Sequence, residues 1–290
     1  MRGAAYPAHA RRQAAATAGY LRLPENMIGP DAGLQVGCAY DGVVDAIRPR
    51  ISLVIPAYNE AELLPRLLDS VETARERFRR GPAAIEVIVA DNLSTDATVA
   101  IARERGCAVV TEVKRCIGAV RNRGAAAASG EVLAFVDADA RLHPLTFDAI
   151  DAAMASGRYV AGATGVRMER WSPGILAAWV MIVPWVIVLR MDTGVVFCRA
   201  DDFLAIGGYN EERLYGEDVQ FLWDLRRLGR PRGQRLVRLA KAKTIASTRK
   251  FDRHGDWHYL TRMPKLAWLM LVDPRASTAF VRDYWYSEDR

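Results

Sequence analysis

From residue 51 onward, short apolar runs alternate with amphipathic segments. Each short run is bounded by polar or turn-forming residues, which predicts strands at 51–55, 85–90, 107–110 and 131–136. Apolar residues at helical spacing and candidate caps predict helices from Leu63 to about Arg80, from Ser94–Asp96 to Gly106, and over 118–129. The alternation is typical of βαβ units, so we predict an α/β fold with a mostly parallel central sheet flanked by helices.

The pattern after residue 150 is mixed. It predicts strands at 159–165 and 194–198, a turn at 207–211, and a helix over 216–229 that begins with acidic residues. Residues 1–50 are rich in Ala, Gly and Arg and lack sustained periodicity, so we expect a partly mobile extension there. The simplest organisation is one compact domain whose two parts cover 51–150 and 151–290.

The longest apolar stretch, Ile175–Leu189, has 15 residues and contains Pro184. A helix that crosses a bilayer needs about 20 apolar residues, so this stretch is short for a membrane span. A buried core helix is the favoured interpretation. Trp179 and Trp185 keep an interfacial segment with partial membrane contact open as the alternative.

Composition narrows the class of protein. An apolar fraction of 51% beside 26% charged residues allows a sizeable core in a globular protein. The four cysteines show no C-x-x-C spacing, which argues against a zinc site or a disulfide framework and fits a reducing compartment. Residues 1–25 lack the apolar core of a signal peptide. We therefore expect a cytoplasmic protein.

The formal charge of +6 is unevenly distributed along the chain. Between Arg226 and Lys265 there are 13 Lys or Arg residues against only Asp252 and Asp256, so this basic block carries 13 − 2 = +11. Such a block can bind nucleic acid, anionic lipid or a phosphorylated substrate, or it can be a solvated face.

Acidic residues follow several of the predicted strands at the point where each ends. Asp137 and Asp139 come after the fourth strand, Asp91 after the second, and the segment Pro56–Glu60 after the first. Parallel strands end at one edge of the sheet, where α/β proteins bind ligands. Side chains two apart on an extended chain share a face, so Asp137 and Asp139 are expected to hold Mg²⁺ or Mn²⁺ beside a substrate phosphate. A solvated acidic turn is the alternative for this pair.

Four blocks, in order, resemble family 2 glycosyltransferases with the GT-A (Rossmann-like) nucleotide-diphospho-sugar transferase fold. They are SLVIPAYNEAELLPRLLDSV (52–71), VIVADNLSTDATVAIA (87–102), GAVRNRGAAAASGEVLAFVDADA (118–140) and GYNEERLYGEDVQFLWDLRRLG (208–229). The resemblance implies a nucleotide-sugar-binding half over 51–150 and an acceptor-binding half with a basic C-terminal segment over 151–290.

The resemblance also assigns a nucleotide-sugar site. Tyr58 would stack on the base, Glu60 would accept hydrogen bonds from the ribose, and Asp91 would bind the base edge. The family usually has a second acidic residue after this aspartate, and here Asn92 stands there, which leaves the nucleotide undetermined. Arg249, with its basic neighbours, would grip the diphosphate. The implied nucleotide-sugar-binding set is Pro56, Ala57, Tyr58, Glu60, Asp91, Arg121, Asp137 and Arg249.

The resemblance implies that Asp137 and Asp139 form a D-x-D motif, with Asp139 the direct ligand of Mg²⁺ or Mn²⁺. His254 or His258 as a third ligand is left open, because a lone histidine is more often polar surface. The acidic pair Glu217–Asp218 is expected to supply catalysis, with Asp218 as the base that deprotonates the acceptor and Glu217 supporting it. Helix capping is the structural alternative for that pair.

The implied reaction is inverting and metal-dependent. A sugar moves in one displacement from a nucleoside-diphosphate sugar to an acceptor hydroxyl. Residues 230–270 contain no Q-x-x-R-W motif, which argues for non-processive transfer. A lipid-linked or saccharide acceptor in cell-envelope glycan or glycolipid synthesis, at the inner face of the membrane, fits the basic block. The alternatives are a nucleic-acid-binding protein or a catalytically silent nucleotide-binding protein; without a recognised motif, no nucleic acid is expected.

Overall fold

The structure is a computed structural model that describes residues 48–213, 216–262, 265 and 268, apart from the side chain of Trp185. The predicted extension over 1–50 therefore lies almost entirely outside the described residues, and so does Cys38. Cys107, Cys116 and Cys198 are free thiols.

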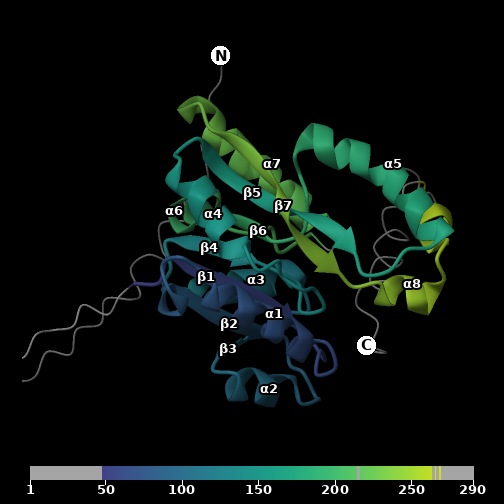
Figure 1. The fold of residues 1–290 in the computed structure, drawn as a ribbon, viewed down its shortest axis with the longest axis horizontal. Helices are drawn as coiled ribbons and strands as arrows, with labels where there is room; N and C mark the ends of the chain where they lie inside the picture. The colour runs from purple at the N-terminus through teal and green to yellow at the C-terminus, as the bar shows by residue number, and fades with distance from the viewer. Residues whose placement is uncertain (1–47, 214–215, 263–264, 266–267, 269–290) are drawn as a thin grey trace, which may run out of the picture. The chain divides into compact units, whose positions relative to one another are not determined.

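Within the described residues, a seven-stranded sheet has the strand order β3-β2-β1-β4-β6-β5-β7 (Figure 1). The first four strands pair in parallel, β6 runs antiparallel to both of its neighbours, and β7 pairs in parallel with β5. The predicted α/β class with a mostly parallel sheet is confirmed. The strands are β1 Ile51–Ala57, β2 Ile85–Asp91, β3 Ala108–Thr111, β4 Val132–Phe135, β5 Tyr159–Met168, β6 Val196–Arg199 and β7 Arg235–Ala246.

Helices cover both faces of the sheet. Neighbouring residues of a central strand point to opposite faces, and in β1 the apolar residues on both faces are buried. Leu53 and Ile55 of β1 belong to a core cluster with α1 and α4, whereas Val54 belongs to a second cluster with α6 and α7. The helices are α1 Leu64–Glu76, α2 Thr98–Glu104, α3 Ile117–Ala126, α4 Thr146–Ala155, α5 Pro173–Leu189, α6 Ala200–Ile206, α7 Glu217–Gly229 and α8 Arg249–His254. Short 3₁₀ turns lie at Pro82–Ala84 and Arg230–Arg232.

Several elements differ from the sequence-based expectation. The first strand continues through Pro56 to Ala57, and α1 ends at Glu76 rather than near Arg80. β7 was not predicted, because basic residues interrupt its apolar pattern and much of the strand is exposed or half-buried. The short helices α6 and α8 were also missed, since neither is long enough to show a period.

The apolar segment 175–189 is helical, as the core interpretation required, but it is not a core helix. Of the large side chains of α5, Ile175 is buried, whereas Leu176, Val180, Ile187 and Val188 are at least half exposed. In Figure 1, α5 lies beside the sheet rather than across one of its faces. The prediction of burial was wrong because apolar content alone does not distinguish a core helix from an apolar surface helix. Among the described residues, no helix has the length and hydropathy needed to cross a membrane.

Candidate active site

A cleft of about 400 Å³ lies where β1 and β4 end, bounded also by α3, the start of α7 and the start of α8. Chain segments more than 180 residues apart therefore contribute to one hollow. All of the predicted site residues except Asp91 line it: Pro56, Ala57, Tyr58, Glu60, Arg121, Asp137, Asp139, Glu217, Asp218 and Arg249.

The two aspartates of the D-x-D segment are not on an extended strand. β4 ends at Phe135, so Asp137 and Asp139 lie in the following turn, on either side of buried Ala138. The expectation that alternation along a strand makes them share a face was therefore wrong in its geometry. Both nevertheless line the cleft, and each pairs with a different arginine.

Arg121 joins three of the acidic residues. Its Nη1 donates to Glu217 Oε1 at 3.0 Å and to Asp218 Oδ1 at 2.9 Å, and its Nη2 donates to Asp137 Oδ1 at 2.9 Å. The residue is only 3% exposed. Both terminal nitrogens are thus engaged by carboxylates, and Arg121 connects the acidic pair of α7 to Asp137 in the turn after β4.

Asp218 lies in the first turn of α7 and opens onto the cleft with 16% of its side chain exposed. Burial raises the pKa of its carboxyl to about 7, with Glu217 and Asp137 adding to the rise, while Arg121 and a hydrogen bond from Tyr209 oppose it. The Tyr209 hydroxyl donates to Asp218 Oδ1 at 3.1 Å. A carboxylate with a pKa near neutrality is suited to accept a proton at neutral pH.

Arg249 links the two remaining acidic groups. Its guanidinium binds Glu60 through two hydrogen bonds of 2.8 and 2.6 Å, and its Nε lies 3.1 Å from Asp139 Oδ2. Burial raises the pKa of Asp139, and Arg249 opposes that rise. Asp139 is half-buried, so part of its carboxylate has lost contact with water, and Asp137 adds to the rise of the pKa.

Tyr58, directly after β1, contributes an aromatic ring to the cleft lining. The Arg115 guanidinium lies 3.8 Å from the centre of the Tyr58 ring, which is a cation–π contact, and both residues line the cleft. Asn92 lines the cleft as well, while its amide donates to the carbonyls of Glu112 and Lys114. Arg115 was not among the predicted site residues. It lies just before α3 and contacts Tyr58, which follows β1.

Asp91 is buried at the end of β2 and does not belong to the cleft lining. Its carboxylate accepts hydrogen bonds from the backbone N–H groups of Leu93 and Ser94. Asp91 therefore shapes the turn after β2, and base binding by this residue stays a prediction.

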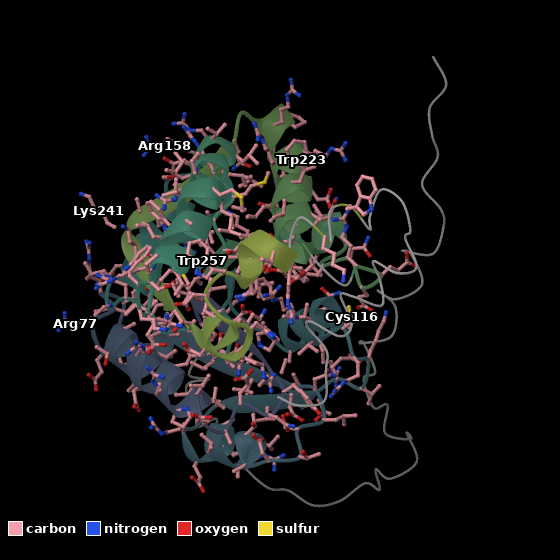
Figure 2. All side chains as sticks on the ribbon, turned by 90° about the vertical axis from the view of Figure 1, so that its right-hand side faces the viewer. Arg77, Cys116, Arg158, Trp223, Lys241 and Trp257 are labelled. Carbon is pink, nitrogen blue, oxygen red and sulfur yellow. The ribbon has the colours of Figure 1, made fainter. Side chains whose placement is uncertain are left out.

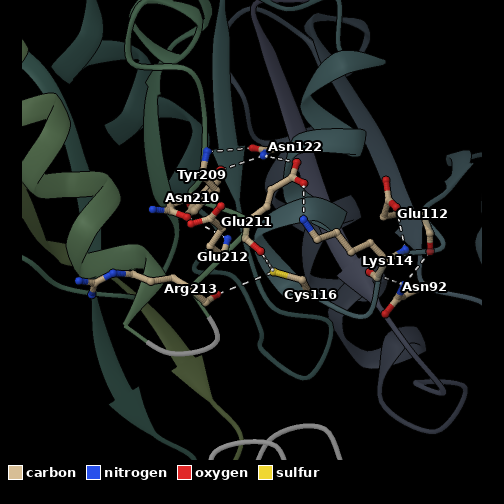
Figure 3. Close-up of polar contacts among 10 residues, drawn as sticks. All are labelled: Asn92, Glu112, Lys114, Cys116, Asn122, Tyr209, Asn210, Glu211, Glu212 and Arg213. Carbon is tan, nitrogen blue, oxygen red and sulfur yellow. Dashed lines mark hydrogen bonds and ion pairs between the residues drawn. The ribbon is translucent and has the colours of Figure 1, made fainter. Parts of the chain in front are cut away.

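The turn that leads to α7 is fastened to α3 (Figure 3). The Asn122 amide accepts from Tyr209 N at 2.8 Å, and it donates to Tyr209 O at 2.9 Å and to Glu211 Oε1 at 3.0 Å. Glu211 also pairs with Lys114 at 2.9 Å, and the Cys116 thiol donates to the Glu211 carbonyl. Asn122 and Tyr209 were not among the predicted site residues, although both stand inside two of the blocks that carry the family resemblance, at RNRG and GYNE.

The two candidate histidines lie elsewhere. Neither His254 nor His258 lines the main cleft, and His254 lines a neighbouring hollow that shares Glu60, Arg249 and Lys250 with it. In the described part of the chain, no group of three or more His, Cys, Asp or Glu side chains converges as a metal site. Asp137 and Asp139 both line the cleft, and cation binding by these two carboxylates stays a prediction.

Comparison with known proteins places this geometry in context. Residues 52–204 match the family model described as Glycosyl transferase family 2. The chain is 35% identical over 101 residues to Glycosyltransferase AglE of Haloferax volcanii, a match covering 33% of this chain and 32% of that protein. The match thus spans about a third of the length of this curated relative.

Two solved structures share the fold. S. aureus TarS 1-349 in complex with UDP-GlcNAc has a TM-score of 0.54 at 20% identity, covering 69% of this chain and 58% of that one. The mannosyltransferase PcManGT of Pyrobaculum calidifontis, in complex with GDP-Man and Mn²⁺, has a TM-score of 0.54 at 18% identity, covering 82% and 74%. The predicted GT-A fold is confirmed by these likenesses.

Proposed function

Because the chain belongs to glycosyl transferase family 2, we propose that it is an inverting, non-processive glycosyltransferase. It moves a sugar from a nucleoside-diphosphate sugar to an acceptor hydroxyl. The observation that carries the proposal is the convergence of Asp137, Asp139 and Asp218 on one cleft at the carboxyl edge of the sheet. Residues 51–150 would supply most of the donor contacts, and residues 151–290 the catalytic pair and the acceptor side.

Asp218 is the proposed base. It takes the proton of the acceptor hydroxyl, whose oxygen attacks the anomeric carbon while the bond from that carbon to the nucleoside diphosphate breaks. One displacement inverts the anomeric centre, so no protein nucleophile is needed. Arg121 and Tyr209 hold the Asp218 carboxylate in place through the contacts at 2.9 and 3.1 Å. Glu217, held by the same guanidinium, supports that position.

On the donor side, Tyr58 is proposed to stack on the base, Pro56 and Ala57 to form the pocket floor, and Glu60 to bind the ribose. Arg249 lies between Glu60 and Asp139, where a diphosphate joining ribose to sugar would pass, so its guanidinium suits the phosphate oxygens. Asp139 and Asp137 would hold Mg²⁺ or Mn²⁺. The chemistry that such a cation supplies when bound is neutralisation of the charge that develops on the leaving diphosphate.

The donor nucleotide is open, since the two structural neighbours are complexes with UDP-GlcNAc and with GDP-Man. PcManGT is a complex with Mn²⁺, which supports a divalent cation for this chain. We further propose a saccharide or lipid-linked acceptor in cell-envelope glycan or glycolipid synthesis, and action in the cytoplasm at the inner face of the membrane. The exposed apolar helix α5 beside basic α8 supports that place.

The proposal is tested with a panel of nucleoside-diphosphate sugars, each with and without Mn²⁺. The measurement is the amount of nucleoside diphosphate released. Asp139→Asn should abolish cation-dependent release. Asp218→Asn should lower kcat on the order of a hundred- to ten-thousandfold, the usual range for a general base, while calorimetry shows donor binding intact. Asp201→Asn, an exposed acid of α6, is the matched control and should leave release unchanged.

Unchanged turnover in Asp218→Asn would refute the assignment of the base. Binding of a nucleotide sugar without release or transfer under any condition would favour the catalytically silent alternative.

A further inference from the structure

The helix α5 carries no charged side chain along its 17 residues. Ile175 and Ala178 in its first half are buried, whereas most of its other large apolar side chains are exposed. Successive helical residues are about 100° apart, so exposed positions such as Leu176, Met181, Ile182 and Val188 fall on different sides of the helix. A protein partner that covers one face of a helix would leave the other sides in water. A helix that is apolar all round requires an apolar medium around it.

The surroundings of α5 are basic and aromatic. Arg170, just before the helix, pairs with Asp252 at 2.5 Å and with Asp256 at 2.7 Å, and Gly174 lies against the Asp256 backbone. These contacts join the start of α5 to α8 and to the segment that follows it. The stretch from Lys250 to Lys265 has more basic than acidic residues: Lys250, Arg253, Arg262 and Lys265 against Asp252 and Asp256.

Exposed tryptophans lie along the same region. Trp171 and Trp179 meet edge to face at 5.9 Å, and both are exposed, as are Trp257 and Trp268. Figure 2 turns the side of the molecule that carries α5 and α8 toward the viewer and shows Trp257 on that side. Tryptophan beside Lys and Arg, at the border of an apolar helix, is the composition of segments that lie in the interface of a bilayer.

The dimensions fit a helix that lies in one leaflet. Seventeen residues span about 25 Å at 1.5 Å per residue, less than the roughly 30 Å hydrocarbon core of a bilayer. The same two segments reach the catalytic cleft, because Thr193 follows α5 and Arg249 and Lys250 begin α8. The segment that follows α5 and the start of α8 therefore both contribute to the cleft lining.

We infer that α5, with the basic residues of α8 and the segment after it, docks the protein on a membrane surface that contains anionic lipid. The apolar side chains of α5 enter the acyl border of one leaflet, and the cationic side chains contact the phosphate groups. Membrane docking itself does not depend on the proposed function. Only its use, which is to present the cleft to an acceptor anchored in the bilayer, rests on that function.

The test is flotation of the full chain with phosphatidylcholine vesicles, with and without phosphatidylglycerol, at low and high salt. The wild-type protein should float with the anionic vesicles and less so as salt rises. The double variant Val180→Glu, Ile187→Glu should lose binding by about tenfold or more, because charged side chains resist entry into hydrocarbon. Val113→Glu and Leu204→Glu, at exposed apolar positions outside α5, are matched controls and should float like the wild type.

Equal flotation of the α5 double variant and the wild type would overturn the inference, and so would wild-type protein that floats with neither vesicle. The inference would also be overturned if the wild-type protein formed dimers and the double variant were a monomer, since a second copy would then cover the helix. So would vesicle binding that appears only after residues 269–290 are removed, since those residues would then be the occupant. Circular dichroism checks the fold, and nucleoside diphosphate release without vesicles reports separately whether the proposed function holds.

Discussion

The Asp218 carboxyl is subject to opposing influences. Burial and two neighbouring acids favour its neutral form, whereas Arg121 and the Tyr209 hydroxyl favour the charged form. The result is a pKa of about 7, so the group is protonated below that pH and cannot then accept a proton. A catalytic role for Asp218 therefore predicts a rate that rises with pH through neutrality.

Tyr209→Phe tests this balance. Removing the hydroxyl removes a hydrogen bond to the charged carboxylate, which raises the pKa of Asp218 further. The acidic limb of the kcat/KM profile should move to higher pH by roughly one unit, since a hydrogen bond to a charged group contributes about 1.5 kcal/mol or more. Activity at pH 9 should change little. Tyr159→Phe, outside the cleft lining, should leave the limb in place, and an unmoved limb in Tyr209→Phe would exclude the coupling.

Residue types at strand ends were predictable, because acidic side chains after parallel strands meet at one edge. Their partners were not. The pairing of Arg249 with Glu60 joins residues 189 positions apart, and no local pattern encodes such a contact. The buried position of Arg121 was equally hidden, since an arginine in a helix usually marks a solvated face.

At the level of elements, the turn before α7 determines the position of Glu217 and Asp218, the proposed catalytic pair. In the sequence this turn is marked only by the motif GYNE. In the structure, the Asn122 side chain of α3 forms hydrogen bonds with both the N–H and the carbonyl of Tyr209 in this turn. The orientation of Asp218 is therefore set by a helix nearly 100 residues earlier in the chain. Preorganised side chains of this kind reduce the cost of reaching the transition state.

Asn122→Ala should loosen the turn without touching the donor contacts. We expect kcat to fall by about tenfold, which corresponds to 1.4 kcal/mol, and KM for the donor to stay nearly constant. Steady-state kinetics on the best donor of the panel measures both. Glu212→Ala, an exposed residue of the same turn, is the control and should behave as wild type. Equal loss in both variants, or a change confined to KM, would contradict the positioning role.

Across the whole molecule, the first half of the sheet was predictable from sequence and the second half was less so. Strands β1, β2 and β4 are short buried runs, so their apolar content identifies them. β6 is antiparallel to both of its neighbours, and basic residues interrupt the apolar pattern of β7. Both strands are placed by pairing with segments distant in the sequence. Apolar periodicity does not encode strand direction, so the antiparallel direction of β6 could not be predicted.

The second half of the sheet depends on a close approach at Gly162 of β5. A Cβ there would lie 2.4 Å from the Val237 carbonyl oxygen and 2.8 Å from the Phe197 ring. Gly162→Ala should therefore lower the free energy of unfolding by about 2 kcal/mol, as overpacking of a rigid core does. Denaturant unfolding measures the change. A Cβ at Gly165 on the same strand would meet the Arg238 and Lys243 side chains at 3.3 Å and the Ala240 backbone at 3.7 Å, an ordinary contact, so Gly165→Ala should unfold within about 0.5 kcal/mol of wild type. Matching values for the two variants would rule out the steric argument.

The guanidinium of Arg249 is shared by two carboxylates that line the cleft on either side of it, Glu60 and Asp139. When either acid acquires another counter-charge, more of the guanidinium becomes available to the other acid or to an incoming phosphate. Occupancy on one side thus changes the affinity on the other, and thermodynamic reciprocity requires the effect to be equal in both directions. Nucleotide and divalent cation would accordingly bind as a cooperative pair, with a single side chain as the link between them.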